Sequence, residues 1–255
     1  KIPKKPYSIA LSLADKIDTL VGFFGIDQKP TSSKDPYALR RLALGIIRII
    51  IENKKDFKIN DLITYSASLY LDQGFEFNNK FLQKDLTNFL MDRLKFFMKE
   101  EKIRHDIIQA SASYFNLDQS VVIFYKAKSL NKIINKPNGI DIILSYKRAS
   151  NILEKELKTE LSNTTDPGIF KTEVEKNLYK KINELIKYFS SINKDENFDY
   201  TLTNLAQSKN IVFDFFDNVI VNEEDLAIKK NRLELIQLLC KTFNNYVNFN
   251  LIDPH

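Results

Sequence analysis

Residues that form turns, crosslinks and metal sites are scarce in this 255-residue chain, which has six glycines, seven prolines, one cysteine, two histidines and no tryptophan. All-β folds need a turn about every ten residues, so the few glycines and prolines favour helices. The single Cys240 excludes a disulfide framework and a thiolate zinc site, and it suits a reducing compartment. There is no long apolar run, so no membrane span is expected, and 44% hydrophobic residues exclude intrinsic disorder.

The charge of the chain is positive but unevenly distributed. The net charge is +5, yet residues 1–60 carry 12 Lys/Arg against 6 Asp/Glu, while residues 146–255 carry 15 against 17. The excess therefore lies in the first quarter. Because most of the cations are lysines in a composition rich in asparagine and isoleucine, the total charge is weak evidence for a polyanionic partner.

Apolar residues recur at three- and four-residue steps along most of the chain, as Ile9, Leu13, Ile17 and Leu20 do. We predict an all-α protein of helical bundles. The first expected helix begins at the N-terminus, and the others cover about 36–52, 61–71, 85 to at least 98, 104–115, the run 121–125, 140–161, 170–190, 198–207 and 224–247. Asp35, Asn60 and Asp85 are the expected N-caps. The apolar run 121–125 has strand propensity but no partner strand, so it is interpreted as a buried helix.

Catalytic patterns are absent from the sequence. The scattered glycines form no phosphate-binding loop. His105–Asp106 is similar to part of a metal-dependent phosphohydrolase ligand set, but the chain has one internal histidine, and a polar helix start is the favoured interpretation. Cys240 lies on an apolar stripe with Ile236 and Phe243, which predicts a core thiol. We therefore expect no active site and no metal site.

Four segments in order resemble one family. They are LADKIDTLVGFFGIDQKPTSSKDPYALRRLALGIIRIIIE (13–52), FLMDRLKFFMKEEKIRHDIIQA (89–110), YKRASNIL (146–153) and FFDNVIVNEEDLAIKKNRLELIQLL (215–239), followed by VNFNLI (247–252). Together they resemble the β subunit of bacterial two-subunit glycyl-tRNA synthetase. Asp27, Asn222 and Lys230 depart from the usual glycine, methionine and arginine. The chain starts without Met and directly in an amphipathic helix, so we expect a C-terminal fragment of that subunit.

The resemblance implies three domains and a role. Residues 1–55 would be the tail of an HD-like domain, in which Asp15 is structural or vestigial, residues 56–145 a connecting body, and residues 146–255 a DALR-like anticodon-binding domain. It implies a non-catalytic, cytoplasmic tRNA-binding part of a glycine–tRNA ligase. The partners would be tRNA-Gly and an α subunit in an α2β2 assembly, with ATP and Mg used in the α subunit and no cofactor here. The alternative is a scaffold that docks the α subunit or the rest of β.

Three clusters are the candidate tRNA contacts, because phosphates need Lys/Arg on one face and unstacked bases need Arg or aromatic planes. The first is Lys147, Arg148 and Asn151, the second Lys229, Lys230, Asn231 and Arg232, and the third Arg40 and Arg41. Each has a structural alternative. For Arg148 and Arg232 it is an ion pair within the domain or a carbonyl contact that holds two helices together. For Asn151 it is a buried hydrogen bond to a neighbouring backbone, and for Arg40 and Arg41 a salt bridge to Asp15 or Asp18.

Overall fold

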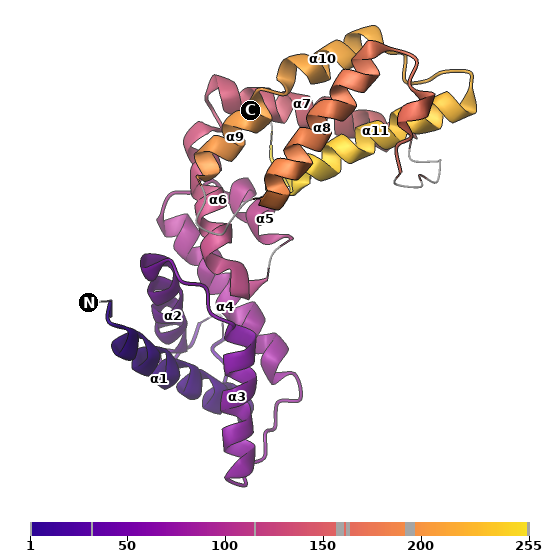
Figure 1. Cartoon of the computed structure of the whole chain (residues 1–255). Helices are drawn as coiled ribbons and strands as arrows, with labels where there is room; N and C mark the ends of the chain where they lie inside the picture. Colours follow the sequence, from indigo (N-terminus) through magenta and orange to yellow (C-terminus); the bar gives the residue numbers. More distant parts are fainter. Residues whose placement is uncertain are drawn as a thin grey trace. The chain divides into compact units, whose positions relative to one another are not determined.

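The computed structural model describes residues 2–31, 33–114, 116–156, 161, 164–191 and 197–253, and all regular structure in these ranges is helical (Figure 1). The predicted all-α class is confirmed. Packing divides the chain into two compact units: unit 1 holds Lys1–Arg104 and Phe115–Phe124, and unit 2 holds His105–Tyr114 and Tyr125–His255. The division into three domains at residues 55 and 145 stays a prediction.

Unit 1 is a packed bundle in which α1 contacts α2, α3 and α4, and α2 packs against α4. The apolar stripe that predicted α1 is buried: Ile9, Leu13, Ile17 and Leu20 all face the core. The elements are α1 (Pro6–Gly25), α2 (Leu39–Asn53), α3 (Ile59–Asp72), α4 (Leu82–Glu100), the 3-10 turn η1 (Leu117–Gln119) and the start of α6 (Ser120–Ile133).

Unit 2 is organised around α7 and α11, which pack along one another, while α8 contacts α10 and α11 and α9 contacts α7. Large aromatic side chains fill its core, among them Tyr146, Phe215, Phe243 and Phe249. The elements are α5 (His105–Ala112), the rest of α6, α7 (Pro137–Glu156), η2 (Pro167–Ile169), α8 (Glu173–Ser191), α9 (Phe198–Ala206), α10 (Lys209–Asn218), α11 (Leu226–Asn244) and η3 (Phe249–Leu251).

The existence of the helices is predicted better than their ends. The run 121–125 lies in α6, so its interpretation as helix is confirmed, and α9 matches its expected range closely. α7 begins at Pro137, so residues 137–139 are its first turn and not a separate turn; residues 157–160 of the expected helix lie outside the described part. α8 and α11 are a few residues shorter than expected. No helix was predicted at the position of α10.

The three expected N-caps lie near helix starts, but none is the capping residue itself. α3 begins at Ile59, so Asn60 is inside its first turn, where its side-chain carbonyl accepts a hydrogen bond from Thr87 at 2.7 Å. Asp85 is in the first turn of α4 and accepts a 2.7 Å bond from Lys29. The Lys29 hydrogen bond holds the pKa of Asp85 below its usual value. Asn60 thus joins α3 to α4, and Asp85 joins α4 to the segment between α1 and α2, so the expected caps at these positions are wrong.

Asp35 stabilises the start of α2 from outside the helix. The helix begins at Leu39 and not at Pro36, and Ala38 in the N-cap position has a left-handed backbone with φ of 54°. The Asp35 carboxylate accepts hydrogen bonds from the backbone N–H groups of Leu39 (2.8 Å) and Arg40 (3.1 Å). The predicted function of Asp35 as a cap is thus retained, although the predicted helix start is wrong.

Replacing Asp35 with alanine is expected to destabilise unit 1 by about 1–2 kcal/mol, because two helix N–H groups lose their acceptor. Urea unfolding followed by circular dichroism measures this. Asp61→Ala is the matched control, since Asp61 lies in the first turn of α3 with only a distant, exposed pair to Lys58 at 4.0 Å. Equal effects from the two substitutions would contradict the capping role of Asp35.

Candidate functional site

The first predicted cluster lies on the second half of α7. Lys147 and Arg148 are half-buried, whereas Asn151 is exposed and its side chain makes no hydrogen bond to the described residues. The expectation of a buried hydrogen bond for Asn151 is therefore wrong. The Lys147 ammonium donates to the backbone carbonyl of Asn250 at 3.2 Å. Within this cluster, Arg148 makes both an ion pair and aromatic contacts.

Arg148 is held by α10. Its guanidinium donates to an Asp217 carboxylate oxygen at 2.6 Å and lies 5.1 Å from the ring centroids of both Phe213 and Phe216. The ion-pair alternative is thus realised for Arg148, but the side chain is still 34% exposed. A fixed, partly exposed guanidinium plane has the geometry that stacks on an unpaired base or binds a phosphate.

Arg148 is at the edge of a cleft of about 360 Å³ between α7, α10 and the segment that follows α10. We call it the Arg148 cleft. Its lining residues are Arg148, Ile152, Lys155, Glu156, Phe216, Val219, Ile220, Val221 and Asn222. Five of the nine lining residues are apolar, and Arg148, Lys155 and Glu156 carry its charges. Apolar walls with a few polar groups are the usual composition of a ligand site.

The second cluster divides between surface and core. The Lys229 ammonium bonds Asn222 at 2.6 Å and Glu156 at 2.8 Å, so it lies beside the Arg148 cleft. Lys230 is half-buried. Asn231 is buried and holds the backbone of Asp166 with two hydrogen bonds, accepting from its N–H at 2.8 Å and donating to its carbonyl at 2.9 Å.

Arg232 lies in the interior of unit 2 with a side chain only 6% exposed. It donates to Glu175 at 2.7 Å, to the carbonyl of Ile220 at 2.7 Å and to Glu223 at 3.0 Å. These bonds realise the ion-pair alternative. Because they hold the guanidinium in the interior, it cannot contact a phosphate in the folded protein. Asn231 and Arg232 therefore have structural roles. Of the second cluster, Lys229 and Lys230 are left as candidates for a tRNA contact.

The third cluster lies in unit 1, where Arg41 is exposed and Arg40 donates to the carbonyl of Thr31. Neither arginine pairs with Asp15 or Asp18 within the described residues. Asp15 instead lies 3.8 Å from Lys16, and Asp18 accepts from the Tyr70 hydroxyl at 3.3 Å. The expected salt bridges are wrong, and a tRNA contact by these two arginines stays a prediction.

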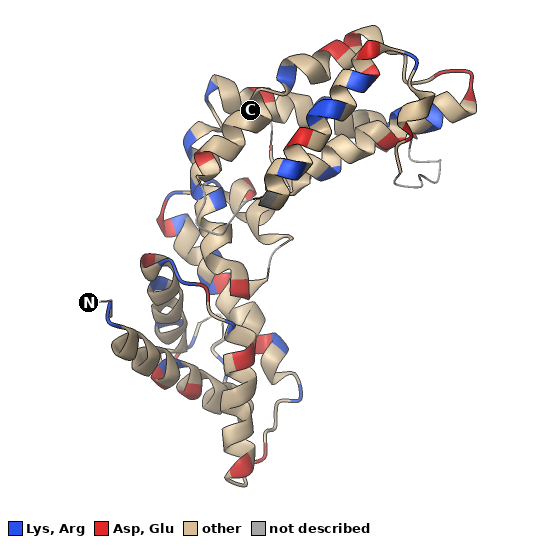
Figure 2. Ribbon diagram, viewed as in Figure 1, with Lys and Arg blue, Asp and Glu red and all other residues tan. Residues whose placement is uncertain are grey.

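Three side chains in or beside the Arg148 cleft were not among the sequence candidates. Lys155 follows Arg148 by seven residues, so helical spacing places it on the same face of α7, and this signal was available. Phe213 and Phe216 are not among the sequence candidates, yet both flank the guanidinium. Figure 2 shows that the cations of unit 2 are spread over several helices with carboxylates between them, which explains why charge counting missed the cleft.

Asp106 and Cys240, the residues considered for catalysis, make contacts within the fold. Asp106 is in the first turn of α5 and accepts a hydrogen bond from the N–H of Ile107 at 2.9 Å. Cys240 is buried, and burial raises the pKa of its thiol to about 12, so the predicted core thiol is confirmed. Among the described residues there is no group of three or more His, Cys, Asp or Glu side chains arranged to hold a metal ion. None of the helices described has the length and hydropathy to cross a bilayer.

Unit 2 is an all-helical domain, and residues 142–253 match the family model described as "DALR anticodon binding domain". Residues 1–113 match the model described as "Glycyl-tRNA synthetase beta subunit". The chain is thus similar to glycyl-tRNA synthetase beta subunits over its first part and to an anticodon binding domain over its last part.

Curated relatives named "Glycine--tRNA ligase beta subunit" agree with this assignment. The proteins of Rickettsia africae and Rickettsia conorii are each 37% identical over 241 residues, which is 94% of this chain and 34% of the relative. That of Rickettsia bellii is 38% identical over 242 residues, with the same coverage. The chain thus spans about a third of the length of these relatives.

Proposed function

We propose that residues 142–253 bind the anticodon arm of tRNA-Gly and that the Arg148 cleft is part of the contact surface. The observation that supports this is the partly exposed guanidinium of Arg148, fixed 5.1 Å from two phenylalanine rings, in a segment that matches an anticodon binding domain. Lys155 and Lys229 add positive charge at the cleft. An arginine plane beside aromatic rings suits an unstacked base together with its phosphate, and the lysines suit neighbouring phosphates.

The function of such a segment is positional. By holding one arm of the tRNA, it raises the effective concentration of the acceptor end at an active site elsewhere in the assembly. We assign glycine activation with ATP and Mg to an α subunit in an α2β2 ligase of the cytoplasm, with no cofactor bound by this chain. The names of the relatives, which are beta subunits of a glycine–tRNA ligase, support a partner subunit in this assignment.

Replacing Arg148 with methionine is expected to weaken binding of a tRNA-Gly transcript about ten-fold, equivalent to about 1.4 kcal/mol. Methionine keeps the apolar contact with the phenylalanine rings and removes the charge. The slope of log affinity against log salt should become shallower by about one, as one phosphate contact is lost. Filter binding at several salt concentrations measures both quantities.

Arg48→Met is the matched control, because Arg48 is also a half-exposed, ion-paired arginine, with Glu100 at 3.5 Å in unit 1. It should leave affinity unchanged. The unfolding midpoint of both variants should stay close to that of the parent, since exposed ion pairs contribute about 1 kcal/mol or less. Parental affinity and salt dependence in the Arg148→Met chain would overturn the assignment of the cleft.

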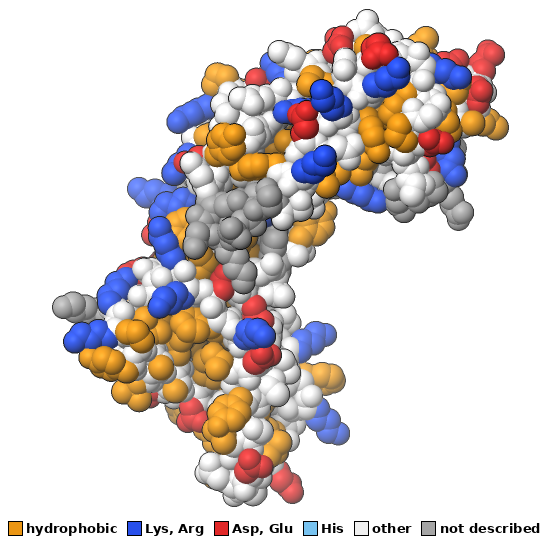
Figure 3. Space-filling view, in the orientation of Figure 1, with side chains coloured by type: hydrophobic (Ala, Val, Ile, Leu, Met, Phe, Trp, Pro, Cys, Tyr) orange, Lys and Arg blue, Asp and Glu red, His pale blue; other side chains and the backbone are white. Residues whose placement is uncertain are grey.

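A scaffold function is the second candidate, and exposed apolar side chains of unit 1 favour it. Leu11 on α1 is 73% exposed, and Tyr7, Tyr65 and Phe75 are also more than half exposed. In Figure 3, hydrophobic side chains gather over the part of the surface where Figure 1 shows α1. Titration with tRNA-Gly and with an unrelated tRNA at physiological salt separates the two functions: equal, weak binding of both would favour the scaffold.

A further inference from the structure

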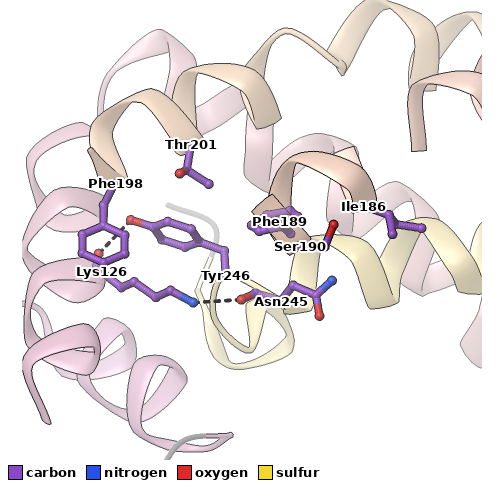
Figure 4. Close-up of a pocket in the computed structure, with 8 residues that line it drawn as sticks. All are labelled: Lys126, Ile186, Phe189, Ser190, Phe198, Thr201, Asn245 and Tyr246. Carbon is purple, nitrogen blue, oxygen red and sulfur yellow. Dashed lines mark hydrogen bonds between the residues drawn. The ribbon is translucent and has the colours of Figure 1, made fainter. Parts of the chain in front are cut away.

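A second concave site lies in unit 2, outside the Arg148 cleft. It is a pocket of about 390 Å³ formed by α6, the C-terminal end of α8, α9 and the C-terminal end of α11 (Figure 4). The lining residues that matter here are Lys126, Phe189, Phe198, Thr201, Asn245 and Tyr246. Lys229 and Asn245 are sixteen residues apart along α11, which corresponds to about 24 Å at 1.5 Å per residue. The two sites are therefore separate contact points on one domain.

Lys126 places a buried ammonium group in this pocket. The residue is only 9% exposed, and its Nζ donates to the carbonyl of Asn245 at 2.9 Å and lies 5.4 Å from the Tyr246 ring centroid. Burial lowers the pKa of Lys126 to about 8. A charged group this deep costs free energy, and a lysine with such a perturbed pKa beside a cavity is a candidate for ligand binding.

Aromatic rings supply the walls. Tyr246 is fully buried and its hydroxyl donates to the Lys126 carbonyl at 3.1 Å, which fixes the ring beside the lysine. The ring of Phe198 meets that of Tyr246 edge to face, with centroids 6.4 Å apart. In the view of Figure 4, Tyr246 lies between Phe198 and Phe189, with Lys126 and Thr201 on its two other sides.

We propose that this pocket receives one unstacked nucleobase of the bound RNA, with the partly exposed rings of Phe189 and Phe198 contacting it and the Lys126 ammonium donating to its carbonyl or ring-nitrogen acceptors. The proposal rests on the proposed function, because it needs RNA held by residues 142–253. Single-stranded loops are recognised in this way, by stacking on aromatic side chains and by hydrogen bonds to the edges of splayed bases. A pocket of a few hundred Å³ with mostly apolar walls and one convergent cation fits such a group.

The test uses the full 255-residue chain and two RNA probes, a tRNA-Gly anticodon stem–loop and a fully paired duplex of the same length. Lys126→Met should weaken binding of the stem–loop about ten-fold and leave duplex binding unchanged. Phe198→Ala should also weaken only the stem–loop. Lys126→Arg should restore most of the affinity, and Lys132→Met is the matched control, since Lys132 is an exposed lysine on the same helix with Asp199 at 3.5 Å.

The pH dependence separates a ligand contact from a structural role. The charged form of Lys126 is present below its pKa of about 8 and is lost above it, so stem–loop affinity of the parent should fall about ten-fold between pH 7 and pH 9. Of the lining residues only Lys126 and Tyr246 titrate. Burial, followed by the charge of Asp199 on α9, holds the pKa of Tyr246 well above its usual value, so the phenol stays protonated. The Lys126→Arg chain should show no such fall.

The outcomes distinguish this inference from the proposed function. If the parent chain binds neither probe, the proposed function is wrong. If the parent binds the stem–loop and Arg148→Met weakens it, but Lys126→Met and Phe198→Ala bind like the parent, the pocket inference is overturned. It is also overturned if Lys126→Met lowers the unfolding midpoint together with affinity while Phe198→Ala keeps full affinity, because the lysine is then only a structural contact to Asn245.

Discussion

Replacing Arg232 with methionine is expected to lower the free energy of unfolding of unit 2 by about 3–5 kcal/mol. The substitution keeps the volume of the side chain but removes the counter-charge of Glu175, which is 1% exposed. A buried carboxylate without its partner pays its full desolvation cost. Urea unfolding, with hydrogen exchange to localise the loss in residues 125–253, measures this effect.

Glu175 has a second function that makes the effect large. It is the third residue of α8, and its carboxylate accepts from the N–H groups of Lys171 (2.8 Å) and Thr172 (2.7 Å), while its own N–H donates to the Thr172 hydroxyl (3.2 Å). This reciprocal pair is a capping box. The same carboxylate thus starts α8 and binds α11 through Arg232, so the loss of the arginine disturbs two elements.

A double-mutant cycle with Glu175→Gln isolates the charge pair. Glutamine keeps an acceptor in the capping box but carries no charge, so the double variant should be more stable than Arg232→Met alone. Arg148→Met is the half-exposed control and should cost about 1 kcal/mol or less. If the double variant were less stable than Arg232→Met, the buried-charge explanation would be wrong.

The pH dependence of this variant follows from the sign of the Glu175 shift. Desolvation raises the pKa of Glu175, but the bonds from Arg232 and from the Thr172 and Lys171 backbone outweigh it, so the net shift is downward from 4.5. The ionised carboxylate therefore stabilises the parent above about pH 4.5, and this contribution is lost as pH falls through the lower folded pKa. Without Arg232, protonation removes the unpaired charge of the buried carboxylate. The difference in unfolding free energy between the parent and the Arg232→Met variant should therefore shrink as the pH is lowered from 7 to 4.

The fold class and most helices follow from apolar spacing, because one buried stripe per helix is enough to show in the sequence, as in α1. The helix starts do not follow so simply. Asp85 and Asn60 have the chemistry of N-caps, but each is held by a side chain from elsewhere in unit 1, by Lys29 and Thr87 respectively. Local capping competes with tertiary hydrogen bonds, and only the folded structure shows which one is made.

In the candidate site, too, the sequence indicates the residue but not its tertiary contacts. The sequence singled out Arg148, but it could not show that α10 covers the guanidinium with two rings and Asp217. It also placed Lys229 and Arg232 in one cluster, although these residues, three positions apart on α11, are a partly exposed lysine and a buried arginine. Charge type does not reveal burial, because a paired arginine can be as deeply buried as leucine.

The second large expected effect concerns Gly139 in the first turn of α7: Gly139→Ala should destabilise unit 2 by about 2–3 kcal/mol. Gly139 is a buried helical residue, and a Cβ atom there would lie 2.1 Å from the carbonyl oxygen of Ile133 and 2.6 Å from the Cα of Ile134. Both atoms belong to the backbone that connects α6 to α7, so the added methyl group cannot be accommodated by rotating a side chain. The connection between the two helices must shift, and the packing of α7 against α11 shifts with it.

Gly45→Ala is the matched control for this prediction. Gly45 is also inside a helix, but a Cβ atom there would meet only the Lys16 side chain, at 3.1 Å from Cε, and the end of a lysine moves easily. Removing a helical glycine then stabilises unit 1 by about 0.5–1 kcal/mol, since alanine loses less backbone entropy on folding. Urea unfolding of both variants should therefore give changes of opposite sign. Stabilisation by Gly139→Ala would mean that the α6–α7 connection tolerates a wider turn, and the close backbone contact at Ile133 would then not be what requires glycine.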